Sequence, residues 1–234
     1  MGIIHTFAHA YDYLFPLNQE TLEFLTLNLP LGKILDVGCA TGTYLLELEQ
    51  LGFLTKGIDS NKQMVEEAKR KAKIKKQKCM FQTEDMLYLR YKNEFDGLIC
   101  IGNTLVHAVN LDEAKRIIDN LYQALSPSGR LVLQIINYDR ITNNKIETLP
   151  IIQYPNVEFE RIYEYSGEKI RFLSKIKVFE SQFNHSVLLM PIKYDTLKQM
   201  LADVGFMDIV SHDGFTNIPF DIEQSLQLVF TCHK

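Results

Sequence analysis

The sequence predicts a doubly wound α/β fold, because short apolar runs alternate with amphipathic helical patterns along most of its first half. Such alternation is typical of parallel strands joined by right-handed helical crossovers. A chain of 234 residues, 46% hydrophobic, is long enough for one domain with an insertion. The expected strands lie at about 33–37, 54–58, 79–83, 95–101 and 130–136. The expected helices lie at 43–51, 61–75 and 111–125.

The stretch KILDVGCATG, residues 33–42, joins the first strand to the first helix of this pattern. A loop of small residues lets the backbone approach a ligand, and the helix behind it offers unpaired N–H groups. Gly38, Ala40 and Gly42 do not have the spacing of a G-x-G-x-x-G dinucleotide loop, and Asp36 precedes the loop. The pattern therefore favours a nucleotide-type cofactor with a cationic group. The alternative is an ordinary tight turn.

The segment ILDVGCATGTYLLEL resembles motif I of the class I S-adenosylmethionine (SAM) dependent methyltransferases, with Ala40 in place of a more usual glycine. The resemblance implies a seven-stranded Rossmann-like methyltransferase sheet whose seventh strand is antiparallel and lies between strands 5 and 6. It also implies SAM as cofactor and S-adenosylhomocysteine (SAH) as product. The expected cofactor-binding residues are Asp36, Gly38, Cys39, Ala40, Thr41, Gly42, Asp59, Ser60, Met64, Asp85, Met86, Ile101, Gly102 and Asn103.

Acidic residues follow three successive strands. Asp59 lies 23 residues after Asp36, where a carboxylate can accept both hydrogen bonds of a ribose diol. In the resembled family the position of Asp85 accepts a bond from the adenine amino group, whereas alone it would be a loop or cap residue. Met64 has two interpretations, as a contact of the adenine face or as helix core. Because carboxyl ends of parallel strands share one edge, the three carboxylates are expected to converge.

After Asn137 the pattern becomes β-rich, which predicts an antiparallel β meander inserted before the last helix and strands. Such an insertion is placed to cover the substrate, and its alternative role is a dimer surface. A single domain is expected, with an N-terminal helical lid at 1–30, a cofactor-binding half at 31–137, the inserted sheet at 150–192, and the last helix with strands 6 and 7 at 193–234.

Two further segments, FDGLICIGNTLVHAVN and LVLQIINYDRI, resemble those of the glycine and sarcosine N-methyltransferases. The resemblance implies methyl transfer by in-line displacement to a small-molecule acceptor, an amine in the first instance. It places Asn137 near the substrate. An arginine holds the substrate carboxylate in that family, and Arg140, Arg161 and Arg171 are the candidates here.

Other residues near the expected site each have two interpretations. His107 is either a general base or a hydrogen-bonded loop residue, and Asn103 orients the acceptor or holds the methionine part of the cofactor. Tyr11 and Phe15 lie in FAHAYDYLFP and either line a lid or pack outside the sheet.

Alternative functions are O-methylation of a small acid or hydroxyl compound, methylation of tRNA or protein, and non-catalytic SAM binding. A dehydrogenase is disfavoured by the glycine spacing. The basic run 69–78 would suit nucleic acid, but a net charge of −4 favours a solvated helix end, so nucleic acid is not the expected partner. A homodimer is compatible with the sequence.

No metal site is expected, since the four cysteines are dispersed and His5 and His9 lack the glutamate of H-E-x-x-H. MGIIHT fits a myristoylation pattern that is too short to be specific. With neither a signal peptide nor an apolar span in view, we expect a cytoplasmic protein without membrane contact.

Overall fold

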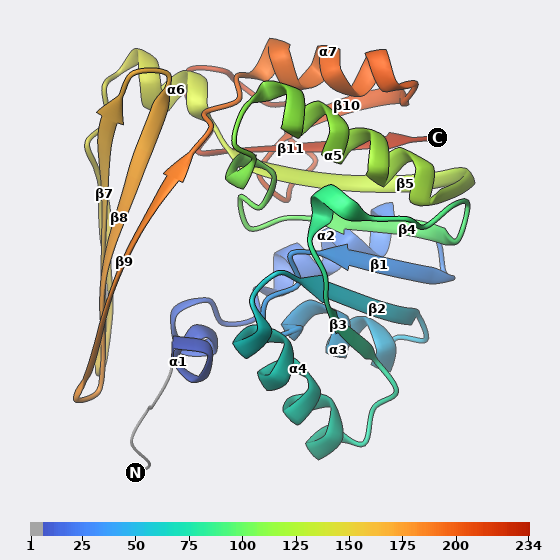
Figure 1. Ribbon diagram of the computed structural model, residues 1–234, viewed down its shortest axis with the longest axis horizontal. Helices are drawn as coiled ribbons and strands as arrows, with labels where there is room; N and C mark the ends of the chain where they lie inside the picture. The colour runs from blue at the N-terminus through green and yellow to red at the C-terminus, as the bar shows by residue number, and fades with distance from the viewer. Residues whose placement is uncertain (1–6) are drawn as a thin grey trace.

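A computed structural model describes residues 7–234, so MGIIHT and the pairing of His5 with His9 lie outside the described residues. The chain forms two sheets that lie side by side, with the larger one covered by helices on both faces (Figure 1). No helix within 7–234 has both the length and the apolar character needed to cross a bilayer.

The large sheet has seven strands in the order β10-β11-β5-β4-β1-β2-β3. Six strands run in the same direction, and β11 alone is antiparallel to both of its neighbours, β10 and β5, which confirms the expected methyltransferase-type sheet. The strands are β1 (Lys33–Val37), β2 (Leu54–Asp59), β3 (Met80–Thr83), β4 (Phe95–Cys100), β5 (Leu125–Ile136), β10 (Met207–Asp213) and β11 (Gln227–His233).

Helices cover both faces of the large sheet because its central strands carry apolar side chains on both faces. Leu35 and Val37 pack under α5 and α7, whereas Ile34 packs under α2, α3 and α4. These helices are α2 (Gln19–Asn28), α3 (Thr43–Gln50), α4 (Lys62–Lys75), α5 (Leu111–Ala124) and α7 (Tyr194–Val204). The 3₁₀ turns η1 (Met86–Tyr88) and η2 (Leu105–His107) follow β3 and β4.

The second sheet is a four-stranded antiparallel meander between α6 (Tyr138–Asn143) and α7. Its strands are β6 (Thr148–Tyr154), β7 (Val157–Ser166), β8 (Lys169–Val178) and β9 (Ser181–Leu189). The lower part of its inner face packs on α1 (Phe7–Leu14), where Ala10 and Leu14 meet Val157 and Phe159. The helix α1 therefore lies between the two sheets (Figure 1).

Three elements differ from the sequence-based expectation. The run 148–154 forms a strand although its periodicity is broken by Pro150 and by a register shift against β7. The SPSGR turn belongs to β5, which begins at Leu125 and shifts register beside Phe95. The NYDRI segment forms the short helix α6, because the Asn137 side chain accepts the N–H of Arg140 as its cap.

Two glycines in loops beside the large sheet, Gly42 at the start of α3 and Gly102 after β4, both have left-handed backbone conformations but differ in the space around them. Gly42 (φ +73°) would place a Cβ 2.5 Å from the Phe81 ring, whereas Gly102 (φ +74°) would place one in open space. We expect Gly102→Ala to cost only the left-handed backbone penalty, about 1–2 kcal/mol. Gly42→Ala adds an overpacking term and should cost about 2–5 kcal/mol. Urea unfolding of both variants measures the difference; equal losses would contradict the steric argument.

Candidate active site

A cavity of about 700 Å³ opens at the carboxyl ends of β1, β4 and β5, beside the link between α1 and α2. The structure therefore brings together the first loop, the turn after β4 and the N-terminal helix. The predicted residues that line it are Tyr11, Phe15, Asp36, Gly38, Cys39, Ala40, Thr41, Ile101, Gly102 and Asn103.

The remaining predicted residues do not line this cavity. They are Gly42, Asp59, Ser60, Met64, Asp85, Met86, His107 and Asn137. Met64 is buried within α4, and Met86 packs against the main core. Asp85 is exposed and caps η1 by accepting the N–H of Leu87 at 2.9 Å. Their roles toward an adenine ring stay predictions.

The carboxylate of Asp59 ties the loop after β1 to the end of β2. Its Oδ2 accepts the N–H of Ala40 at 2.9 Å, and its Oδ1 accepts the N–H of Asn61 at 2.8 Å. Each carboxylate oxygen has a second lone pair, so the pair remains able to accept the hydroxyls of a diol. Ala40 holds φ +46°, a left-handed conformation that explains why a glycine would be easier at this position.

Asp36 is the most unusual group of the cavity. Its side chain is only 4% exposed, and Oδ1 has no hydrogen-bond partner among residues 7–234. Burial, together with the negative charge of Asp59, raises the pKa of Asp36 to about 8. A cation placed here would compensate the desolvated carboxylate, which is what the position of Asp36 before the loop predicts.

Gln134, at the end of β5, lines the same cavity and was missed by the sequence analysis. Its Oε1 accepts the N–H groups of Gly102 at 2.8 Å and Asn103 at 3.1 Å. This fixes the amide so that Nε2 remains for a ligand. A glutamine inside the apolar run LVLQII, 4% exposed, was the available signal.

The side chain of Asn103 forms two hydrogen bonds to β5 and α6. Its Oδ1 accepts the N–H of Ile136 at 3.1 Å, and its Nδ2 donates to the Tyr138 hydroxyl at 2.9 Å. Asn103 therefore joins the turn after β4 to the end of β5, and one Nδ2 hydrogen and one lone pair of Oδ1 remain for a ligand.

Asn137 is placed differently from the sequence-based expectation. It is 1% exposed, and its Nδ2 donates to the carbonyls of Ile222 and Ser225, both at 2.9 Å. With Oδ1 capping α6, these bonds assign Asn137 to holding the 222–225 turn rather than to the cavity wall. Its predicted contact with the acceptor stays a prediction.

Burial keeps two further side chains near the cofactor carboxylates, His107 and Tyr11, in their neutral forms. Desolvation lowers the pKa of His107, although the Asp59 carboxylate opposes this shift, so the imidazole is uncharged at neutral pH. Burial raises the pKa of Tyr11, and the charges of Asp59, Asp12 and Asp36 raise it further. The Tyr11 hydroxyl thus stays protonated, interacts electrostatically with both cofactor-site carboxylates, and is available as a donor to a ligand.

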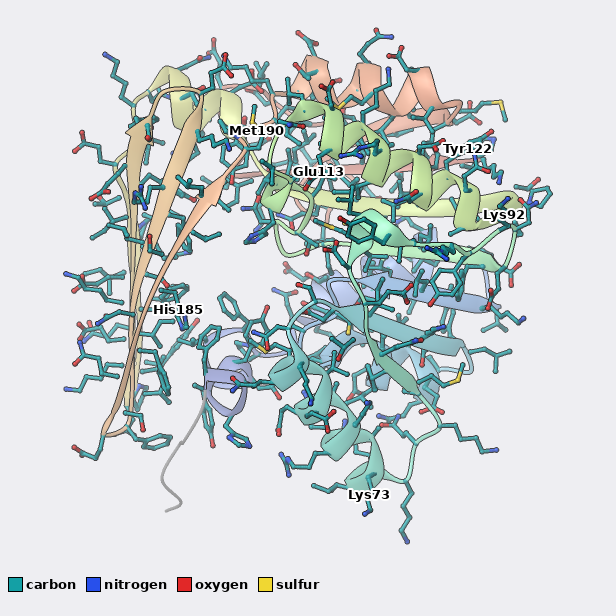
Figure 2. All side chains as sticks on the ribbon, viewed as in Figure 1. Lys73, Lys92, Glu113, Tyr122, His185 and Met190 are labelled. Atoms are coloured by element: carbon teal, nitrogen blue, oxygen red, sulfur yellow. The ribbon has the colours of Figure 1, made fainter. Side chains whose placement is uncertain are left out.

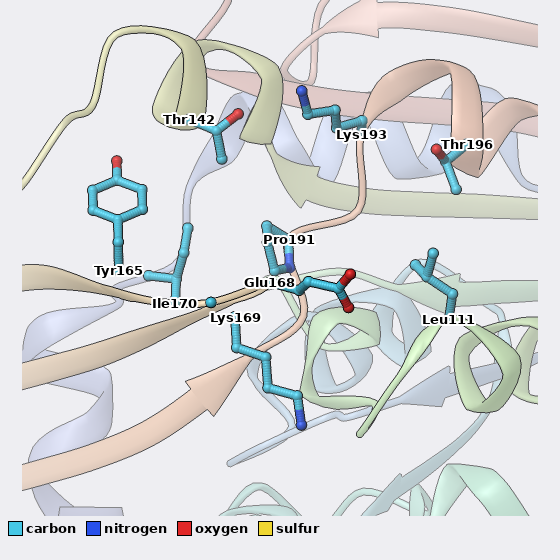
Figure 3. Close-up of a pocket in the computed structure, with 10 residues that line it drawn as sticks. Leu111, Thr142, Tyr165, Glu168, Lys169, Ile170, Pro191, Lys193 and Thr196 are labelled. Carbon is cyan, nitrogen blue, oxygen red and sulfur yellow. The ribbon is translucent and has the colours of Figure 1, made fainter.

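A second cavity of about 320 Å³ lies between the turn after β7 and the start of α7 (Figure 3). Tyr165, Lys169 and Lys193 line it, and none of the predicted site residues does. Among the described residues, no group of three or more His, Cys, Asp or Glu side chains is placed to hold a metal ion.

Known proteins resemble this chain in its overall fold and in the sequence of its cofactor-binding half. A methyltransferase domain model matches residues 34–129. A glycine/sarcosine N-methyltransferase from Aphanothece halophytica is 26% identical over 188 residues, which cover 78% of this chain and 69% of that protein. This methyltransferase domain and the relatives together support a class I SAM-dependent methyltransferase. An S-adenosylmethionine-dependent methyltransferase from Clostridium acetobutylicum shares its fold with a TM-score of 0.82, at 17% identity and 97% coverage of both chains.

SAM is the cofactor of this methyltransferase, and a SAM-bound amino pentose methyltransferase from Micromonospora echinaspora has the same fold. That structure has a TM-score of 0.69 at 14% identity and covers 100% of this chain and 99% of its own. The residues present fit such a cofactor, because Asp36 Oδ1 has no partner within residues 7–234 and Gly102 leaves open space. Asp36 is suited to the cationic part and Asp59 to the ribose.

Binding of SAM should depend on pH through Asp36. Below about pH 8 the empty site holds a proton on this carboxyl, and a bound cation must displace it. We expect affinity to rise up to about tenfold per pH unit between pH 6 and 8 and then to level off. Calorimetry in buffers of different ionisation enthalpy should detect the released proton. Asp36→Asn should bind more weakly and without this pH dependence; an unchanged profile would contradict the assignment.

Asn137→Ala should destabilise the methyltransferase more than it weakens SAM binding. The substitution removes the donor of the buried Ser225 carbonyl and of the partly buried Ile222 carbonyl, and it removes the cap of α6, at a cost of about 2–4 kcal/mol. Asn144→Ala, which removes an exposed bond at the other end of α6, is the matched control and should cost less than about 1 kcal/mol. Lost turnover at unchanged stability would instead support the predicted contact with the acceptor.

Proposed function

We propose that this methyltransferase transfers the methyl group of SAM to the nitrogen of a small amine that also carries an anionic group. Two kinds of support converge on it. Relatives include proteins named glycine/sarcosine N-methyltransferases, and an amino pentose methyltransferase shares the fold. The polar side chains on the inner face of the antiparallel sheet supply the observation that carries the proposal.

A row of polar side chains crosses that inner face. Arg161 of β7 is paired in register with Ser174 of β8, which in turn is paired with His185 of β9. Directly paired residues of antiparallel strands share a face, and the ring of His185 lies 4.5 Å from that of Phe7 in α1. In Figure 2 the labelled His185 projects from β9 on the side of the large sheet. The row therefore faces the cofactor half.

Two donors in or beside this row have no partner among the described residues: the buried Arg161 Nε and the Tyr163 hydroxyl. The positive charge of Arg161 lowers the pKa of Tyr163, although burial outweighs it and raises that pKa to about 12. Each unpaired buried donor lowers the stability of the empty protein by about 1–3 kcal/mol. A ligand with a negatively charged oxygen can accept from both the cationic Arg161 and the neutral Tyr163, so this pair favours binding of an anionic group.

The row of Arg161, Ser174 and His185 lies close to the main cavity, with an aromatic residue of β7 on each side of Arg161. On one side Phe159 meets Phe15, which lines the cavity, with ring centroids 5.7 Å apart. On the other side Tyr163 joins the core that contains Tyr138, the partner of Asn103. Arg161 is thus bracketed by residues that reach the cofactor site.

The other two candidate arginines are less suitable for the same role. Arg171 lies on the opposite face of the antiparallel sheet and pairs with Glu164 at 3.8 Å. Arg140 lies in the first turn of α6 and does not line the main cavity. Arg161 is therefore the arginine that we assign to the acceptor.

The chemistry requires positioning more than proton removal. When bound, SAM supplies an activated sulfonium methyl group. A neutral amine would attack in line with its lone pair, the new C–N bond would replace the C–S bond, and the nitrogen would then lose a proton to water. Holding the amine by its anionic end can supply about 7–11 kcal/mol of the barrier. His107 has an uncharged imidazole but does not line the main cavity, so its role as a general base stays a prediction.

The basic run 69–78 gives little support to the tRNA alternative. Four of its seven positive charges already pair with carboxylates. The pairs are Lys69 with Glu66, Arg70 with Glu67, Lys71 with Asp12, and Lys75 with Glu47. The phosphate-binding capacity of this helix is reduced accordingly. O-methylation of a phenol or an acid stays the chemical alternative, and the test below includes it.

The test is SAH release with glycine, sarcosine, other amino acids, amines without an anionic group, phenols, small acids and tRNA. We expect turnover with anionic amines, and Arg161→Met should raise their KM at least about tenfold. Arg171→Met, on the outer face of the same sheet, is the matched control and should leave KM unchanged. Turnover confined to phenols, acids or tRNA would exclude an amine acceptor, and equal KM values in both variants would exclude the anion site.

A further inference from the structure

One lysine of the basic run has partners unlike those of its neighbours. Lys71 is 15% exposed, whereas Lys75 is 43% exposed and pairs with Glu47 away from the cavity. Lys73, labelled in Figure 2, lies toward the far end of α4 from α1. The partner of Lys71 is Asp12 of α1, which is 59 residues away in the sequence and 2.5 Å away in space.

Lys71 and Asp12 form a closed cluster with two threonines. The Lys71 ammonium donates to Asp12 Oδ2, to Thr43 Oγ1 at 2.9 Å and to Thr41 Oγ1 at 3.3 Å. Asp12 Oδ1 accepts the hydroxyls of Thr41 at 2.5 Å and Thr43 at 3.1 Å. All three ammonium hydrogens and both carboxylate oxygens are used. The cluster therefore has one well-defined geometry that joins α1, the cofactor loop and α4.

The two threonines flank Gly42, at the junction of the cofactor loop with α3. Thr41 lines the main cavity and is completely buried. The cluster thus fixes both sides of the loop that approaches SAM. A partly buried ion pair of this kind contributes little net stability, because desolvation offsets the attraction, and its value lies in specifying one arrangement.

The arrangement that it specifies is the position of Tyr11. Tyr11 precedes Asp12, lines the cavity, and has its hydroxyl in the electrostatic field of Asp36 and Asp59. Without Lys71, α1 would keep the apolar contacts of Ala10 and Leu14 with the antiparallel sheet, and the pair of His9 with Glu67 of α4 at 3.4 Å. The Tyr11 ring would keep its contacts with Phe7 and Phe15. Asp12 is the residue of α1 that bonds to the two threonines of the cofactor loop, so the loss of Lys71 acts on the link that sets the Tyr11 hydroxyl over that loop.

We propose that Lys71 is a positioning residue for SAM binding, which acts through Asp12, Thr41 and Thr43 to hold Tyr11 over the cofactor. The lysine that the sequence pattern presents as part of a solvated basic run thus belongs to the cofactor site. The inference concerns SAM alone, so it can be tested without an acceptor and stands or falls independently of the proposed amine substrate.

The test compares Lys71→Met with Lys75→Met, which removes an ammonium one turn further along the same helix. We expect SAH to bind at least about tenfold more weakly to Lys71→Met and within about twofold of wild type to Lys75→Met. Hydrogen exchange should show faster exchange in residues 7–14 of Lys71→Met, with α4 and the large sheet unchanged. Equal affinities in the two lysine variants, or faster exchange throughout the molecule, would overturn the proposal.

A double-variant cycle shows whether Lys71 acts through Tyr11. Tyr11→Phe alone should weaken SAH binding, and adding it to Lys71→Met should produce almost no further loss, because the hydroxyl is already displaced. Fully additive losses would mean that the two side chains act independently and would also overturn the proposal. SAH is the probe in every measurement.

Discussion

The cofactor site depends on two carboxylates that the fold withdraws from water at neighbouring strand ends. In the part of the chain that the structure describes, one oxygen of Asp36 has no hydrogen-bond partner, whereas Asp59 is anchored by two backbone N–H groups. Parallel strands force this proximity, because β1 and β2 are adjacent and end at the same edge. The free energy that the empty site loses through the desolvated Asp36 is regained when a cation binds. Stability of the empty protein and affinity for the cofactor are therefore opposed at this residue.

Much of the fold could be predicted because the signals are local. Alternating strand and helix patterns, and acidic residues after three strands, depend on spacing of a few residues and survive folding unchanged. The position of β11 followed from the resemblance, since local pattern does not determine strand order. The strand β6 was missed because Pro150 and its register shift break the alternation that identifies a strand.

Site residues whose role depends on distant partners could not be predicted. The row of Arg161, Ser174 and His185 exists only through the register of three strands, and a shift by one residue would turn it to the other face. Asn137 has the sequence context of a substrate ligand, but its two donors are taken by carbonyls 85 and 88 residues away. Lys71 appeared as one positive charge among several, because the sequence does not show that Asp12 lies opposite it.

The position of α1 links the two halves of the protein thermodynamically. One side of the helix bonds to the cofactor loop through Asp12, and the other packs on the antiparallel sheet through Ala10 and Leu14. A single rigid helix that forms part of both surfaces cannot move for one without moving for the other. If a ligand on the antiparallel sheet changes the affinity for SAM by some factor, SAM must change the affinity for that ligand by the same factor. An eight-residue helix thereby makes donor and acceptor occupancy reciprocal.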